Sequence, residues 1–173
     1  MNQAVTMLLG ATALYVAAVA QTTLADLVAI GTIAPDALAL VAVVAVLYRR
    51  DSAPWLIAAT VGLVADLIAP GRFGVEAACF VLLAIVVVSS GVSGRSSLFT
   101  QVAACAAASA TAAFASASLH GAFGESEMSI ASTAANSLAI GVYTAAFGVP
   151  VLMVVKWINE GPLSRSERLE AFS

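Results

Sequence analysis

A series of long apolar segments fills almost all of this 173-residue chain, and one acidic residue, Asp66, lies inside one of them. Hydrophobic residues make up 61% of the sequence and charged residues only 10%. A soluble domain of this size cannot bury so much apolar surface, whereas a lipid bilayer accommodates it. An acidic side chain in an apolar segment needs a partner, an aqueous pocket or a position near the membrane surface. The sequence therefore predicts a multi-span membrane protein in which Asp66 has a specific role.

About six transmembrane helices are expected, packed as one all-α bundle. They are predicted at residues 4–24, 35–48, 54–68, 74–92, 98–119 and 130–158. A span needs roughly 20 apolar residues, so the second is short unless part of 27–34 also enters the membrane. The sixth is long enough to tilt, and Pro150 can bend it. Residues 1–158 are thus expected to form a single polytopic domain, followed by a short cytoplasmic tail at 159–173.

The distribution of basic residues predicts the orientation of the bundle. Cytoplasmic loops of membrane proteins are enriched in Lys and Arg. If the N-terminus is cytoplasmic, only Arg72 of the seven basic residues lies outside. The other six are Arg49, Arg50, Arg95, Lys156, Arg165 and Arg168. Both termini are therefore expected in the cytoplasm. The scattered basic residues form no patch, so nucleic-acid binding is not expected.

The third span carries Ala58, Gly62 and Asp66 at intervals of four residues, which places them on one helix face. Small side chains at this spacing allow another helix to approach closely in a membrane. Asp66 is therefore expected to point into a helix–helix interface near the outer end of its span.

Pro35 and Asp36 suit the start of the second helix, because an acidic residue in the first turn accepts free backbone N–H groups. Arg72, between Gly71 and Gly74, is the basic residue at the same outer end. We expect an outer cluster in which Arg72 pairs with Asp36 or Asp66. The bond is either structural or part of a substrate or proton site.

Small residues dominate the last two spans. The fifth is rich in alanine on every face, so it is expected inside the bundle or against a partner protein. In the sixth, Asn136 is expected to bond across helices, and Gly141 and Gly148 to allow close approach.

No motif predicts catalysis, a cofactor or a metal site. Gly91-Val92-Ser93-Gly94 matches the G-x-S-G of rhomboid intramembrane proteases, and His120 is the single histidine. A Ser–His pair must lie within hydrogen-bond reach, but the fifth helix separates these residues by roughly 30 Å. Ser93 is therefore expected at a loop and His120 at the surface of a helix end. The chain is not expected to be an enzyme.

The order and spacing of several residues resemble the rod-shape-determining MreD family. They are Gln21 near the end of the first span, Pro35-Asp36, Gly62 with Asp66, and Gly71 with Gly74, together with a last span containing Asn136 and Pro150. The resemblance implies a multi-pass protein of the bacterial cytoplasmic membrane, with a fold similar to the substrate-binding components of energy-coupling-factor transporters. These residues would then be structural or partner-facing.

The resemblance also implies a function and partners. The expected role is a non-enzymatic scaffold of the cell-elongation machinery that directs peptidoglycan synthesis. Its partners would be an MreC-like single-span protein, a RodA-like glycosyltransferase, a class B penicillin-binding protein, MreB, membrane lipid and a further copy of the chain. The alternative is a substrate-binding membrane component of an energy-coupling-factor type transporter, with a solute pocket near Asp36, Asp66 and Arg72.

Overall fold

The computed structural model describes residues 3–23, 25–31, 33–48, 53–69, 72–124 and 129–160, and the regular elements within these ranges are helices joined by short loops. The helices are α1 (Gln3–Thr23), α2 (Ala25–Val28), α3 (Ala37–Tyr48), α4 (Pro54–Ile68), α5 (Val75–Ser89), α6 (Leu98–Ala122) and α7 (Ile130–Glu160). The six long helices coincide with the six predicted spans to within a few residues. The short α2 lies between α1 and α3.

The helices differ in length and in how apolar they are. In the described part, two helices are long and apolar enough to cross a membrane, over Leu98–Ala122 and Ile130–Asn159. The helices α3, α4 and α5 are apolar but shorter, with 12, 15 and 15 residues. Pro150 lies on the exposed side of α7, which continues to Glu160.

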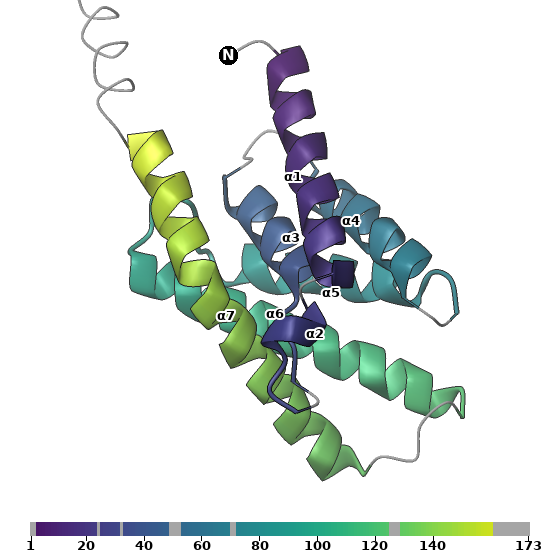
Figure 1. Cartoon of the computed structure of the whole chain (residues 1–173). Coiled ribbons are helices and arrows are strands. Elements are labelled where there is room, and N and C mark those ends of the chain that lie inside the picture. Colours follow the sequence, from purple (N-terminus) through teal and green to yellow (C-terminus); the bar gives the residue numbers. More distant parts are fainter. Residues whose placement is uncertain are drawn as a thin grey trace, which may run out of the picture.

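Helix α3 forms the centre of the bundle, where α1, α4, α5, α6 and α7 all contact it. Ala39, Ala42 and Val43 in its middle are completely buried. In Figure 1, α1 and α7 flank α3, and α2 lies between α1 and α7. A bundle packed around a short apolar helix brings the ends of several helices together, and Asp36, Asp66 and Glu76 lie at such ends.

Glycines permit the closest helix contacts. A Cβ atom added to Gly62 would lie 2.5 Å from the Cα of Ala77, so α4 and α5 touch backbone to backbone. A Cβ atom on Gly141 would lie 2.5 Å from the carbonyl oxygen of Ala106, which gives α7 the same kind of contact with α6. The close approach predicted for Gly62 and Gly141 is therefore confirmed.

The alanine-rich helix α6 packs against both α5 and α7. Ala104, Ala108 and Ala112 are buried on its inner side, as expected for a helix inside the bundle. Ala103 and Ala107 on the same helix are exposed. One face of α6 thus completes the bundle while the other remains available at the surface.

Candidate functional site

The carboxylates whose side chains the structure describes, Asp36, Asp66 and Glu76, lie at one end of the bundle. Asp36 precedes α3, Asp66 is in the last turn of α4 and Glu76 is in the first turn of α5. Helix α6 ends at the same level with His120 in its last turn. The predicted acidic positions therefore do share one end of the molecule.

Asp66 binds the start of the neighbouring helix. Its Oδ1 accepts the backbone N–H of Glu76 at 2.9 Å, and its Oδ2 accepts that of Ala77 at 3.1 Å. The first N–H groups of a helix have no partner within it, and they carry partial positive charge. A carboxylate from α4 thus caps α5, and Gly62 one turn earlier lets the two helices come close enough for this contact.

Gly74 makes the turn that brings α5 into this position. It is the residue before the helix, and its φ of 97° is in the left-handed region that favours glycine. Gly71, the other glycine of the predicted motif, lies outside the described residues.

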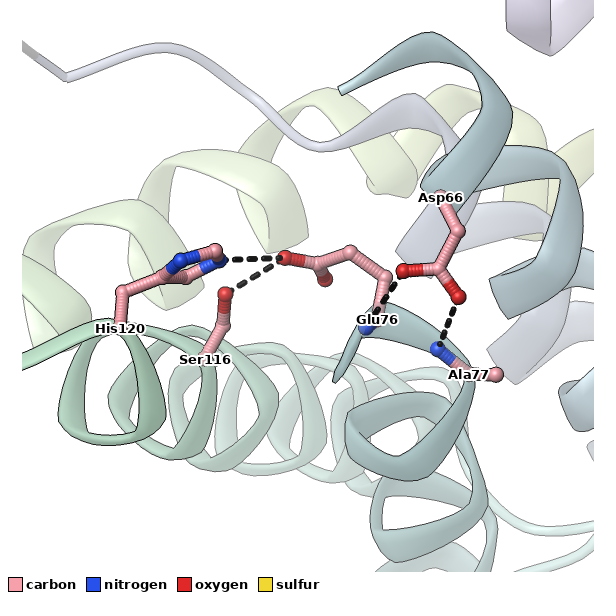
Figure 2. Close-up of polar contacts among 5 residues, drawn as sticks. All are labelled: Asp66, Glu76, Ala77, Ser116 and His120. Carbon is pink, nitrogen blue, oxygen red and sulfur yellow. Dashed lines mark hydrogen bonds and ion pairs between the residues drawn. The ribbon is translucent and has the colours of Figure 1, made fainter. Parts of the chain in front are cut away.

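Glu76 continues the polar chain from α5 to α6 (Figure 2). Its Oε1 accepts a hydrogen bond from the hydroxyl of Ser116, and the Nε2 of His120 lies 3.9 Å away. The side chains of His120 and Glu76 are only 24% and 20% exposed. His120 was predicted to be a surface residue at a helix end. This was wrong in part, because Ser116 and His120 are one turn apart and face Glu76 together.

The guanidinium of Arg72 lies over an aromatic ring. Its Cζ is 4.4 Å from the ring centroid of Phe123, a cation–π geometry. Among the described residues, the predicted ion pair of Arg72 with Asp36 or Asp66 is not formed. The physical reason is that backbone N–H groups occupy the oxygens of Asp66, while Arg72 turns toward the end of α6.

A second polar cluster closes the start of α3. The Oδ1 of Asp36 accepts the N–H of Ala39, and the Oε1 of Gln21 in α1 accepts the N–H of Ala37, both at 2.8 Å. The N–H of Asp36 donates to the hydroxyl of Thr144 in α7 at 2.9 Å. The helix start predicted at Pro35-Asp36 is confirmed. Gln21 and Thr144 join three helices at this point.

A cavity of about 210 Å³ lies beside this cluster, between α1, α2, α3 and α7. Its walls are apolar apart from Gln21, Asp36 and Thr144. The wall nearest α2 is fixed by the hydroxyl of Tyr143, which donates to the carbonyl of Val28.

A polar network at the opposite end of the bundle was not predicted. The side chain of Gln101 is 0% exposed. Its Nε2 donates to the carbonyls of Gly94 at 2.9 Å and Ser96 at 3.1 Å, and its Oε1 accepts the hydroxyl of Tyr48. The sequence signal was a glutamine in the first turn of an otherwise alanine-rich helix, where an unpaired amide would be costly.

Of the remaining predicted positions, Asn136 is half-buried in α7 and Pro150 is exposed. The residue next to Asn136, Ser137, is the buried polar position of that turn. The interhelical bond of Asn136 stays a prediction.

In the described part of the chain, the fold and these clusters define a class of protein: an apolar bundle of helices whose acidic side chains hold helix ends together. The family model of the rod shape-determining protein MreD matches residues 1–158, so the chain belongs to the MreD family. It is a bacterial membrane protein of the rod-shape machinery. Comparisons with curated proteins and with solved structures each found no match.

Proposed function

We propose that this protein is a non-enzymatic integral membrane scaffold of the cell-elongation machinery and that it binds an MreC-like single-span partner. RodA-like glycosyltransferase, class B penicillin-binding protein and MreB would join the same complex. The observation that supports this most directly is the use of the polar groups. Asp36 and Asp66 accept backbone N–H groups, and Glu76 accepts Ser116. These bonds hold the bundle together, as a scaffold requires.

The proposed topology has six spans and two cytoplasmic termini. In this topology α1, α3, α4, α5, α6 and α7 would alternate in direction, so the ends that carry Asp36, Asp66 and Glu76 would face outward. Arg95, in the loop between α5 and α6, would face the cytoplasm, in agreement with the positive-inside rule. Residues 1–158 would form the membrane domain and 159–173 the tail.

The exposed face of α6 is the candidate contact surface for the partner helix. Ala103 and Ala107 lie one turn apart and are exposed, so the backbone of another helix can approach closely there. Along α7, by contrast, large apolar side chains such as Leu138 and Val142 are exposed, and these suit lipid.

The test is affinity purification of the tagged protein from gently solubilised native membranes. We expect an MreC-like single-span protein to co-purify. The double variant Ala103→Leu, Ala107→Leu should reduce its recovery at least several-fold, because larger side chains block close helix approach. Ala135→Leu on the exposed side of α7 is the matched control and should leave recovery unchanged. Unchanged recovery in the double variant would rule out this face, and recovery of no such protein would contradict the scaffold proposal.

The cavity beside Gln21, Asp36 and Thr144 favours a second candidate function, the solute-binding component of a transporter. A solute pocket is concave, largely apolar and equipped with a few polar groups, which this cavity provides. Saturable binding of a vitamin-like solute by purified protein, weakened by Thr144→Val, would support it. Recovery of a coupling subunit with paired ATPases in the purification above would do the same.

A further inference from the structure

The cavity of about 210 Å³ beside Asp36 is bounded on its two sides by α1 and α7. Its apolar walls include Ala20 from α1, Leu40 from α3, and Phe147 and Val151 from α7. In the described part of the chain, α1 and α7 both pack against α3 but not against each other. Phe147 and Val151 are 43% and 41% exposed, so the α7 wall reaches the surface of the bundle. A ligand can therefore enter the cavity between α1 and α7.

The polar groups in this cavity are fixed by bonds to the start of α3. The Oδ1 of Asp36 accepts the N–H of Ala39, and the hydroxyl of Thr144 accepts the N–H of Asp36. The Oε1 of Gln21 accepts the N–H of Ala37. Side chains that are already ordered lose little further entropy when a ligand binds. The cavity is therefore preorganised at its polar side.

The charge of the cavity is negative. Among the lining residues that the structure describes, Asp36 is the charged one, and none is a lysine, arginine or histidine. The hydrogen bond that holds the carboxylate of Asp36 comes from a backbone N–H, which carries only partial positive charge. A carboxylate among apolar groups is stabilised most by a donor that is itself positively charged. The cavity therefore favours a cationic ligand with N–H groups.

The size and the walls of the cavity limit which cation fits. Pockets for drug-sized ligands begin at about 300 Å³, so this cavity suits a smaller molecule. The hydroxyl oxygen of Thr144 has a second lone pair and offers another acceptor besides the carboxylate of Asp36. A primary ammonium has three N–H donors, and an unbranched hydrocarbon chain matches the apolar walls.

We propose that this cavity binds a small aliphatic amine through its primary ammonium. The ammonium donates to the carboxylate of Asp36 and to the hydroxyl oxygen of Thr144. The chain of the amine lies against the apolar walls and points toward the opening between α1 and α7. The site gives the solute-binding candidate function its ligand class and rests on that candidate, whereas the scaffold proposal does not depend on it.

The test is isothermal titration calorimetry on the full chain in detergent micelles, with n-hexylamine and the neutral 1-hexanol as matched ligands. Titration into empty micelles corrects for partitioning. We expect n-hexylamine to bind at least about tenfold more tightly than 1-hexanol, because a charged donor makes the stronger hydrogen bond. Asp36→Asn should remove most of this difference, since asparagine caps a helix as well as aspartate does but carries no charge.

Two further variants localise the binding. Glu76→Gln removes a negative charge at the same end of the bundle but outside the cavity lining, and it should keep the full difference. Ala20→Leu fills part of the cavity and should weaken the binding of both ligands.

Equal affinity of the two ligands for the unmodified protein would overturn the recognition of an amine and leave a neutral solute as the ligand of the transporter candidate. Binding of neither ligand would also overturn the amine site. A difference that persists in Asp36→Asn would show that this carboxylate does not bind the ammonium. Affinities unchanged by Ala20→Leu would show that the ligands bind outside this cavity.

Discussion

Gly62 lies directly against Ala77, with no side chain between α4 and the backbone of α5. A Cβ atom at Gly62 would come within 2.5 Å of the Cα of Ala77 and within 2.9 Å of the carbonyl oxygen of Glu76. This contact brings Asp66, one turn further along α4, into reach of two N–H groups of α5. Close packing and helix capping are therefore two consequences of one small residue.

Gly62→Ala should destabilise the protein by about 1–3 kcal/mol, because the new methyl group meets backbone atoms that cannot move independently. Thermal unfolding in mild detergent, followed by tryptophan fluorescence, measures the loss. Gly10→Ala is the control, since a Cβ atom at Gly10 meets nothing within 4 Å. It should be neutral or stabilising by up to about 1 kcal/mol. Equal behaviour of the two variants would contradict the close contact.

Asp66→Leu should lower the free energy of unfolding by about 2–4 kcal/mol, because it leaves the N–H groups of Glu76 and Ala77 without their acceptors. Asp66→Asn keeps one acceptor oxygen and should cost about half as much. Because the partners are backbone groups, the charge-swapped double variant Asp66→Arg, Arg72→Asp should be no more stable than Asp66→Arg alone. Recovery of folded protein in the double variant would show that Arg72 is the partner after all.

Gln101→Leu should cost about 3 kcal/mol, since the carbonyls of Gly94 and Ser96 lose their donor in a buried position. Tyr48→Phe removes only the hydroxyl bonded to Gln101 and should cost about 1 kcal/mol. In a protein that already carries Gln101→Leu, Tyr48→Phe should lower the free energy of unfolding much less than it does alone. A double-mutant cycle on the free energy of unfolding checks this, and strictly additive effects would contradict the network.

Thr144→Val should destabilise the protein by about 1–3 kcal/mol, because valine has a similar shape but no oxygen for the N–H of Asp36. Thr12→Val is a suitable comparison. The hydroxyl of Thr12 is exposed and bonds only the carbonyl of Leu8 in its own helix, so its loss should change stability by less than about 0.5 kcal/mol. A Thr144 variant as stable as the Thr12 variant would show that α7 does not cap α3.

Glu76→Gln and Ser116→Ala should show a coupling energy of about 1–3 kcal/mol, because a hydrogen bond to a carboxylate is stronger than a neutral one. The cycle is measured by thermal unfolding at a fixed pH. Ser118→Ala, at an exposed position of the same helix, should be additive with Glu76→Gln. Additivity at Ser116 as well would mean that the Glu76–Ser116 bond does not link α5 to α6.

The sequence predicted helices and helix faces better than it predicted polar partners. Pro54 marks the start of α4 at the predicted residue. The spacing of Ala58, Gly62 and Asp66 placed them on one face, from which Gly62 and Asp66 contact α5 while Ala58 is buried. Apolar periodicity and proline are local signals. They predict the helices correctly because the membrane-facing and interior surfaces are both apolar in the folded protein.

The partner of Asp66 was missed because the sequence displays charges but not free backbone donors. Arg72 was the visible cation, yet the N–H groups at the start of α5 carry partial positive charge and lie within hydrogen-bond distance of Asp66. Gln101 was missed for a related reason: its partners are carbonyls of a loop, whose position depends on tertiary packing. The sequence did hold one signal for the partner of Asp66: Gly74 and Glu76 mark the start of a helix close to it.

In the proposed six-span topology, the short helices α4 and α5 would set the local thickness of the membrane. Helices α4 and α5 have 15 residues each and are therefore about 23 Å long. The hydrocarbon layer is about 30 Å thick, while α7, with 31 residues, exceeds it at about 47 Å. In that topology the bilayer would thin beside α4 and α5, and α7 would tilt. Asp66 and Glu76, at the ends of the short helices, would then lie close to the hydrocarbon, where water cannot supply hydrogen bonds and the protein supplies them itself.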